Sequence, residues 1–133
     1  MNTNDYLRQI RTIDTRIDNK LEQVERMKSL RERVTTTLTG MPHGGGDTDK
    51  LTTITERIWE LERQINEDID QLVTLKTEVR ERINAIPDDR YRAVLESKYL
   101  CFKTWETIAE DMGYDVRNIY FLHGRALQAY EAC

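Results

Sequence analysis

The chain has 133 residues, of which 33% are charged and 38% hydrophobic, with two prolines and six glycines. This composition favours long solvated helices over sheets and limits the chain to one or two small domains. The formal net charge of −4 excludes a general electrostatic attraction to nucleic acid, so any DNA contact has to come from a local basic patch.

Cysteine content and the first residues indicate the compartment. Cys101 and Cys133 are too few for a disulfide framework, which indicates a reducing environment. The opening sequence MNTNDYLRQIRT lacks the apolar core of a signal peptide, and no long apolar run follows it. We therefore expect a soluble cytoplasmic protein with no membrane partner.

The first predicted element is a long amphipathic helix that begins near Tyr6. Its apolar residues recur at steps of three or four, as one helical face requires. They are Ile10, Ile13, Ile17, Leu21, Val24, Met27, Leu30, Val34 and Leu38. The segment TGMPHGGGDTDK then ends the helix, because glycines and a proline interrupt it. We expect a flexible connector at residues 40–48, with His43 in solvent and Thr48 or Asp49 capping the next helix.

The second predicted helix has the same kind of face and ends at AIPDD, where Pro87 blocks continuation. Its apolar residues are Leu51, Ile54, Ile58, Leu61, Ile65, Ile69, Leu72, Leu75, Val79 and Ile83.

Both faces contain two successive steps of four, an irregularity that locally unwinds a supercoil. The steps are Ile13–Ile17–Leu21 and Leu61–Ile65–Ile69. Folding the chain at the glycines places Leu21 near Ile69, so that the two irregularities meet. Residues 3–86 are therefore predicted to form an antiparallel helical hairpin, a coiled coil with arms of ~50 Å, and residues 1–86 form the first domain.

Trp59 and Val73 lie off the main apolar face and admit two interpretations. They pack on the C-terminal domain or stay exposed, or they belong to the contact between two hairpins in a four-helix bundle. We expect the second arrangement, a homodimer, because small cores commonly need oligomerisation.

The last tract, residues 87–133, is predicted to form a domain of short helices. Asp88 or Asp89 caps the first of these, whose inward residues are Val94, Leu95 and Tyr99. The segment CFKT is a break, and Thr104 caps the next helix, which buries Ile108, Ala109 and Met112. Asp115 caps the last helix, which buries Val116, Ile119, Leu122 and Leu127.

The spacing within this tract is typical of a helix-turn-helix. Such a unit needs a small residue where its helices cross, here Ala109, and a glycine four residues later, here Gly113. Apolar residues then follow at helical steps at Val116, Ile119 and Leu122. The alternative is an ordinary three-helix packing unit.

The segment TWETIAEDMGYDVRNIYFLHGRAL, Thr104 to Leu127, resembles region four of bacterial sigma factors. Their pattern is roughly T-x-x-E-I-A-x-x-L-G-x-S, followed by a helix that ends in A-R-A-L. The opening TWE and the ending HGRAL are more similar to the ArpU- and RinA-like transcriptional regulators of phages and prophages of Gram-positive bacteria. The two apolar stripes around GMPHGGGDTDK match that family too. The resemblance implies a DNA-binding regulator of phage late genes, acting in the bacterial host cell.

The recognition helix departs from the sigma pattern in its charge. Basic residues are usual where this chain has Val116, Asn118 and Tyr120, and a polar or basic residue is usual where it has Phe121. Residues 88–133 contain eight acidic and six basic side chains, a net charge of −2. Weak binding to double-stranded DNA is expected from this domain alone, since phosphate neutralisation supplies much of the affinity.

The candidate DNA-binding residues project away from the apolar face of the last helix. They are Arg117, Asn118, Tyr120, Phe121 and Arg125. Arg117 suits a guanine edge or a phosphate, Asn118 an adenine edge, and the aromatic rings a thymine methyl group or a sugar. Alternatively, the two aromatic residues pack on the hairpin or a partner protein, and Arg125 caps helix carbonyls or pairs with an acid.

No catalytic, metal or cofactor site is predicted. Cys101, His123 and Cys133 match no zinc-ligand spacing, and the three glycines lack the strand and the Lys-Ser/Thr pair of a phosphate-binding loop. No Ser, Cys or His arrangement suits nucleophilic catalysis, so we expect no enzyme and no cofactor.

Three functional hypotheses remain. The first is a small dimeric phage or prophage transcriptional regulator that places its last helix in the major groove. The second is an interaction module that binds host RNA polymerase or another regulator, favoured by the acidic surface and by Tyr120 and Phe121. The third is a DNA-packaging subunit like a small terminase, although such proteins usually carry the DNA-binding domain first.

Overall fold

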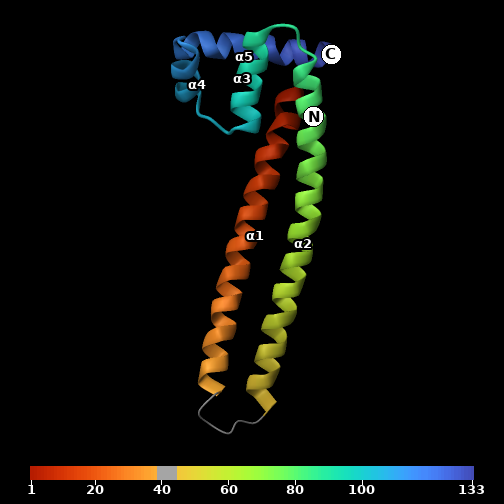
Figure 1. Cartoon of the computed structure of the whole chain (residues 1–133), viewed down its shortest axis with the longest axis vertical. Helices are drawn as coiled ribbons and strands as arrows, with labels where there is room; N and C mark the ends of the chain where they lie inside the picture. Colours follow the sequence, from red (N-terminus) through yellow and green to blue (C-terminus); the bar gives the residue numbers. More distant parts are fainter. Residues whose placement is uncertain (39–44) are drawn as a thin grey trace. The chain divides into compact units, whose positions relative to one another are not determined.

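The computed structural model describes residues 1–38 and 45–133, and this part of the chain is all-helical with no strand. The elements are α1 (Thr3–Leu38), α2 (Gly45–Asn84), α3 (Asp89–Leu95), the π-helix η1 (Glu96–Leu100), α4 (Trp105–Met112) and α5 (Val116–Ala132) (Figure 1). The predicted all-α class is confirmed for these residues. None of the helices in the described ranges is long and apolar enough to cross a membrane.

The predicted connector lies largely outside the described residues, so a flexible segment at residues 40–48 and a solvated His43 stay predictions. Helix α2 begins at Gly45, ahead of the Thr48 or Asp49 at which we expected it to be capped.

Contacts divide the chain into two compact units, and the division does not follow chain order. The terminal unit combines Met1–Ile13 with Leu72–Cys133, and the middle unit is Asp14–Gln71. The ends of α1 and α2 therefore belong with the later helices, whereas the sequence suggested a boundary between residues 86 and 87.

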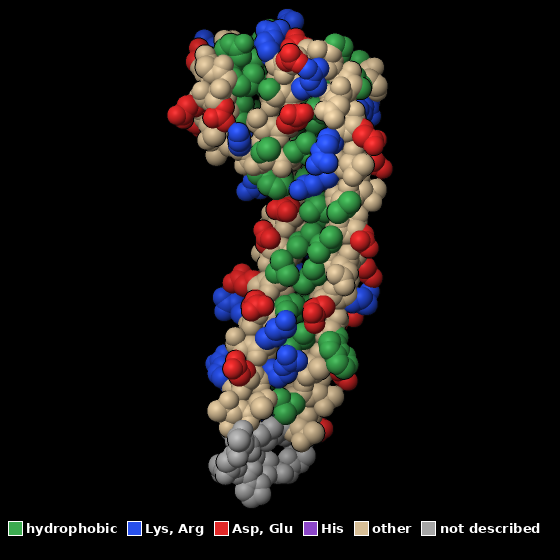
Figure 2. All heavy atoms as spheres, in the orientation of Figure 1, with side chains coloured by type: hydrophobic (Ala, Val, Ile, Leu, Met, Phe, Trp, Pro, Cys, Tyr) green, Lys and Arg blue, Asp and Glu red, His purple; other side chains and the backbone are tan. Residues whose placement is uncertain are grey.

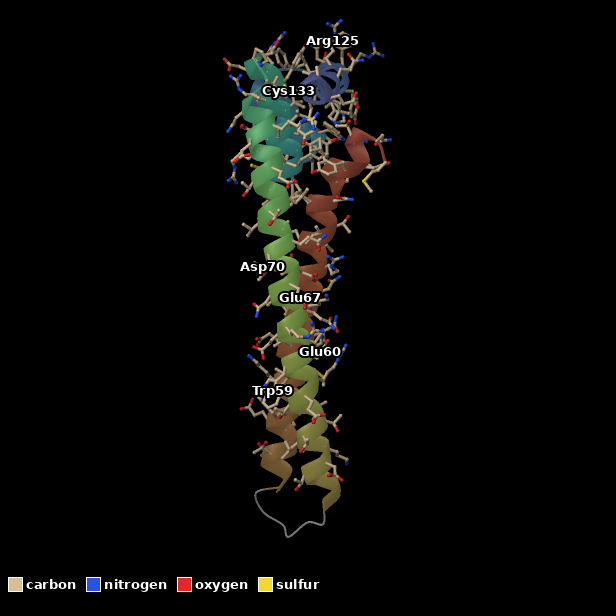
Figure 3. The ribbon with its side chains drawn as sticks, turned by 90° about the vertical axis from the view of Figure 1, so that its right-hand side faces the viewer. Trp59, Glu60, Glu67, Asp70, Arg125 and Cys133 are labelled. Carbon is tan, nitrogen blue, oxygen red and sulfur yellow. The ribbon has the colours of Figure 1, made fainter. Side chains whose placement is uncertain are left out.

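In the middle unit, α1 and α2 run antiparallel and bury an apolar seam (Figure 1). The seam residues, each no more than 7% exposed, are Ile17, Val24, Ile54, Ile58, Leu61 and Ile65. Burial of such side chains stabilises the pair by roughly 1.5–3 kcal/mol each. On α2, Arg63 forms ion pairs with Glu60 and Glu67, one turn away on either side. The two glutamates are labelled in Figure 3.

A charged cluster interrupts the apolar seam. Asp68 is only 8% exposed, and it accepts a hydrogen bond of 2.8 Å from Lys20 Nζ. Arg16 adds an ion pair at 3.2 Å to the same carboxylate. These contacts, the bond from Lys20 first, hold the pKa of Asp68 below its ordinary value. They also fix which residues of α1 stand opposite residue 68.

The contact between Lys20 and Asp68 agrees with the predicted register, which placed Leu21 at the level of Ile69. The expected burial of these two residues is wrong. Leu21 is 47% exposed and Ile69 is 40% exposed, so neither lies in the seam. The ion pair of Lys20 and Asp68 lies in the seam at this point instead. On α1, the inward positions run from Ile17 to Lys20 and then to Val24, by steps of three and four. A search for apolar periodicity ignores charged residues, so it could not predict that Lys20 and Asp68 would occupy the seam as a pair.

The terminal unit contains the core of the short helices. Its cluster of buried residues is Val94, Ile108, Ala109, Ile119 and Leu122. A second set, each no more than 1% exposed, is Leu7, Ile10, Val79, Ile83, Ile86 and Leu95, and it includes residues from the ends of α1 and α2.

Hydrogen bonds join the helix ends within the terminal unit. Tyr99 Oη lies 2.6 Å from Asn4 Oδ1, and Arg82 Nε donates to the carbonyl of Tyr130 at 2.9 Å. Arg82 also lies over the Tyr130 ring, at 4.7 Å from its centroid. Both tyrosines are buried, so these bonds satisfy polar groups that water does not reach freely.

The predicted caps of the short helices are confirmed. Asp88 accepts from the backbone N–H of Arg90, Thr104 from that of Thr107, and Asp115 from that of Asn118. Gly113 has φ +73°, a left-handed backbone conformation that ends α4. Glycine adopts this conformation readily because it has no Cβ.

A double-mutant cycle tests the charged cluster in the seam. Asp68→Leu should lower the free energy of unfolding by about 1–3 kcal/mol, because Lys20 and Arg16 lose their partner. Combining it with Lys20→Leu should recover most of that loss or exceed it, because apolar residues of similar volume replace a desolvated pair. Urea denaturation of both single variants, the double variant and the wild type measures the coupling. Additive losses would show that the two charges do not act together.

Candidate nucleic-acid interface

The exposed face of α5 is the candidate site, and local sequence fixes where it begins. Gly113 turns the chain after α4, and Asp115 caps α5 with a bond of 2.8 Å from the backbone N–H of Asn118. Ile119, Leu122 and Ala126 then point into the core and are at most 6% exposed. The opposite face of the helix is thereby left to solvent.

All five predicted site residues lie on α5. Arg117 and Asn118 are exposed in its first turn, and Tyr120 and Phe121 are 52% and 59% exposed. Arg125 stands one turn after Phe121, with its guanidinium carbon 4.6 Å from the centre of that ring. Figure 3 shows Arg125 pointing outward from the helices.

The structure brings some of these residues together and separates others. Tyr120 packs edge-on against Trp105 of α4, with 5.3 Å between ring centroids. Phe121 contacts Arg125 instead, which is not the helix cap or acid pair considered from the sequence. In the described part of the chain, neither Arg117 nor Arg125 forms an ion pair, so both guanidinium groups keep their N–H donors for a partner.

Sequence reasoning missed Gly124, which lies on the same face as Arg117 and Phe121 at helical steps of four and three. A Cβ added to Gly124 would meet nothing within 4 Å. Glycine inside a helix costs about 1 kcal/mol relative to alanine, and packing within this chain does not require it here. The signal was present as the glycine in HGRAL, since an isolated glycine in a helical pattern often marks a close approach of the backbone to a partner.

Comparisons of this chain with protein-family models, with curated proteins and with solved structures found no match. The case for a function therefore rests on the geometry and charge of the described residues.

The division into units changes the charge around the site. The terminal unit contains eleven acidic and eleven basic residues, because the ends of α1 and α2 contribute Arg8, Arg11, Lys76, Arg80 and Arg82. The middle unit has thirteen acidic and nine basic residues, and so accounts for the whole net charge of −4. A count over residues 88–133 alone makes the surroundings of α5 more acidic than they are.

Behind α5, His123 joins a buried polar chain. Its Nε2 lies 2.6 Å from Tyr99 Oη, and its ring stands edge-on to Trp105 at 4.7 Å. Burial, followed by the charges of Lys98 and Arg8, lowers the pKa of His123 to about 4. Cys101 and Cys133 are exposed free thiols, and in residues 1–38 and 45–133 no three His, Cys, Asp or Glu side chains gather as metal ligands would.

The lowered pKa of His123 predicts a loss of stability in mild acid. The unfolded chain takes up the proton near the ordinary histidine value of 6.5, whereas the folded chain resists it until about pH 4. The free energy of unfolding should therefore fall as the pH decreases from 7 to 5. Urea denaturation at both pH values should show this fall in the wild type and a smaller one in His123→Gln. An equal fall in both chains would assign the acid sensitivity to other groups.

Proposed function

We propose that the chain is a DNA-binding transcriptional regulator of a phage or prophage, in which α4, the turn at Gly113 and α5 act as a helix-turn-helix similar to sigma region four. The observation that carries the proposal is the uncovered face of α5, which starts directly after a tight, well-capped turn. In helix-turn-helix proteins, the first residues of the second helix reach base edges. Arg117 occupies that place.

Gly124 supports the same function. A DNA backbone or groove wall that approaches α5 closely would meet a side chain at this position, and glycine removes it. The exposed Phe121 beside it offers an apolar surface to a thymine methyl group or a sugar. No catalytic step is part of this proposal.

The charge distribution is compatible with weak, local DNA binding. The net charge of the whole chain suggests that α5 repels the phosphate backbone. Because the terminal unit is neutral, we expect no such repulsion. Only Arg117 and Arg125 on α5 are basic, so the affinity from this face alone is expected to be low.

A second function is favoured by one observation, the exposure of two aromatic side chains. Tyr120 and Phe121 present apolar area at the surface, and aromatic residues are enriched at protein interfaces. In this alternative, α5 binds host RNA polymerase or another regulator.

The DNA-binding proposal predicts distinct effects for three substitutions on α5. Against a duplex selected by the wild type from a random library, Arg117→Ala should weaken binding by about one to two decades, since a base contact is worth about 1–3 kcal/mol. Arg125→Ala should weaken the affinity for selected and random duplexes alike, because Arg125 is expected to contact a phosphate. Gly124→Ala should weaken DNA binding and yet raise the free energy of unfolding by about 0.5–1 kcal/mol.

Fluorescence anisotropy titrations at two salt concentrations measure these affinities, and urea denaturation measures the stabilities. Arg57→Ala is the matched control, because it removes one exposed arginine from the middle unit and should leave binding nearly unchanged. If the wild type selects no duplex even at low salt, while Phe121→Ala abolishes binding to purified host RNA polymerase, the interaction-module function replaces this one.

We also propose that the chain self-associates through an apolar patch of the middle unit, formed by Leu21, Trp59 and Ile69. Leu21 and Ile69 each follow a member of the Lys20–Asp68 pair by one residue. One residue further along a helix lies about 100° further round its axis. In an antiparallel pair, this turn places Leu21 and Ile69 on the same side of the seam. Trp59 is 65% exposed and projects from α2 into solvent (Figure 3).

Substitution of Ile69 separates self-association from folding. Ile69→Asp should turn a dimer into a monomer at micromolar concentration while the thermal transition is kept, because Ile69 is exposed. Ile65→Asp should instead unfold the helix pair, because Ile65 is only 5% exposed. Sedimentation velocity and circular dichroism provide the two measurements. A wild type that is monomeric at every concentration would remove this proposal and leave DNA binding unaffected.

A further inference from the structure

The terminal unit contains a pocket of about 490 Å³ that does not involve the exposed face of α5. It lies between residues 7–12 of α1 and the segment 98–105, which connects η1 to α4. Its apolar walls come from Leu7, Tyr99, Phe102 and Trp105. This volume is in the range of sites that bind small molecules.

Four cations line this pocket, which we call the cationic pocket, and three of them lack an acidic partner. Lys103 forms an ion pair with Asp111 at 2.9 Å. Arg8, Arg11 and Lys98 form none with any residue in the described ranges. On the face drawn in Figure 2, Lys and Arg side chains lie beside hydrophobic ones near the short helices. Because the terminal unit has as many acids as bases, this excess of positive charge is local.

Aromatic rings contact two of these cations, Arg11 and Lys98, and also Lys76 nearby, without neutralising them. Arg11 Cζ lies 5.0 Å from the ring centre of Phe102, Lys76 Nζ lies 5.8 Å from it, and Lys98 Nζ lies 4.4 Å from the ring centre of Trp105. A cation–π contact stabilises the positive charge and leaves N–H donors for an anion.

Phe102, whose ring contacts Arg11 and Lys76, has an unusual backbone conformation. Phe102 has φ +57°, and it is the one non-glycine residue with positive φ in the described part of the chain. A bulky side chain rarely adopts this conformation, and such strain gathers at functional sites. The strained residue here is the one whose ring contacts both Arg11 and Lys76.

The charges of Arg8 and Arg11 act on Lys98, which lines the cationic pocket with them. The pKa of Lys98 is lowered by burial first, and then by the charges of Arg11 and Arg8, which together outweigh the opposing charge of Glu106. An anion among these three groups would relieve their mutual repulsion.

From this geometry we propose that the cationic pocket binds a phosphate group, held by Arg8, Arg11 and Lys98. Guanidinium groups match phosphate oxygens with paired N–H donors, and a phosphate has enough charge to interact with several cations at once. The phosphate belongs either to the DNA backbone, in which case this inference rests on the proposed function, or to a free phosphorylated ligand, in which case it stands alone.

Titrations with two probes distinguish these sources. Inorganic phosphate and a random duplex are added separately to the full chain carrying Trp59→Phe, at constant ionic strength for the phosphate arm. Fluorescence of Trp105, which lines the pocket, reports binding. Arg8→Gln should weaken whichever probe binds by about tenfold, the value of one charge-assisted contact. Arg80→Gln is the matched control, because it removes one exposed arginine of the same unit away from the pocket, and it should change little.

Saturable binding of inorganic phosphate that Arg8→Gln weakens and Arg80→Gln does not would assign the pocket to a free ligand. Binding of the duplex alone, with a salt slope that Arg8→Gln reduces by about one unit, would assign it to the DNA backbone. Equal behaviour of Arg8→Gln and Arg80→Gln with both probes, in variants that keep the thermal transition of the wild type, would overturn the proposal. Phosphate binding without any duplex binding would support the pocket and contradict the DNA-binding function.

Discussion

The terminal unit depends on burial of the ends of α1 and α2 among the short helices. Leu7, Ile10, Val79 and Ile83 are fully buried, and they enlarge a core that 45 or so residues of short helices would otherwise have to build alone. The same burial sets the position of neighbouring polar groups. Because Leu7 and Ile10 face inward, Arg8 and Arg11 lie at the edge of the core, where the segment after η1 meets them. Burial of the first turns of α1 therefore both enlarges the core and positions the arginines of the cationic pocket.

Charge is distributed unevenly between the two units, and for anion binding this distribution matters more than the net charge of the chain. The acidic excess belongs to the middle unit, where carboxylates lie along solvated helix faces and pair with arginines such as Arg63. Such exposed pairs contribute little stability. In the terminal unit, unpaired arginines remain on α5 and around the pocket. An acidic chain can thus present local sites that attract anions, since screening at physiological salt limits the reach of the distant acids to about 8 Å.

Three positions break a local rule, and two of them, Asp68 and Phe102, take part in a contact beyond local structure. Asp68 is a charge in an apolar seam, and its bond to Lys20 pairs one level of α1 with one level of α2. Phe102 has a left-handed backbone, and its ring contacts two cations. Gly124 is a glycine in a helix with open space beside it, which favours an external partner. Stability alone would select a different residue at each of them.

The sequence by itself determined the helices and most of their ends, because caps, prolines and glycines act over three or four residues; the start of α2 at Gly45 is an exception. Asp88, Thr104, Gly113 and Asp115 do what local chemistry predicts. Periodicity also identified most of the buried residues. It failed at Leu21 and Ile69, because an apolar pattern does not register two charges that neutralise each other across a seam. Only the tertiary structure placed Arg8 and Arg11 beside Lys98, about ninety residues further along the chain, because that proximity depends on which helix ends share a core.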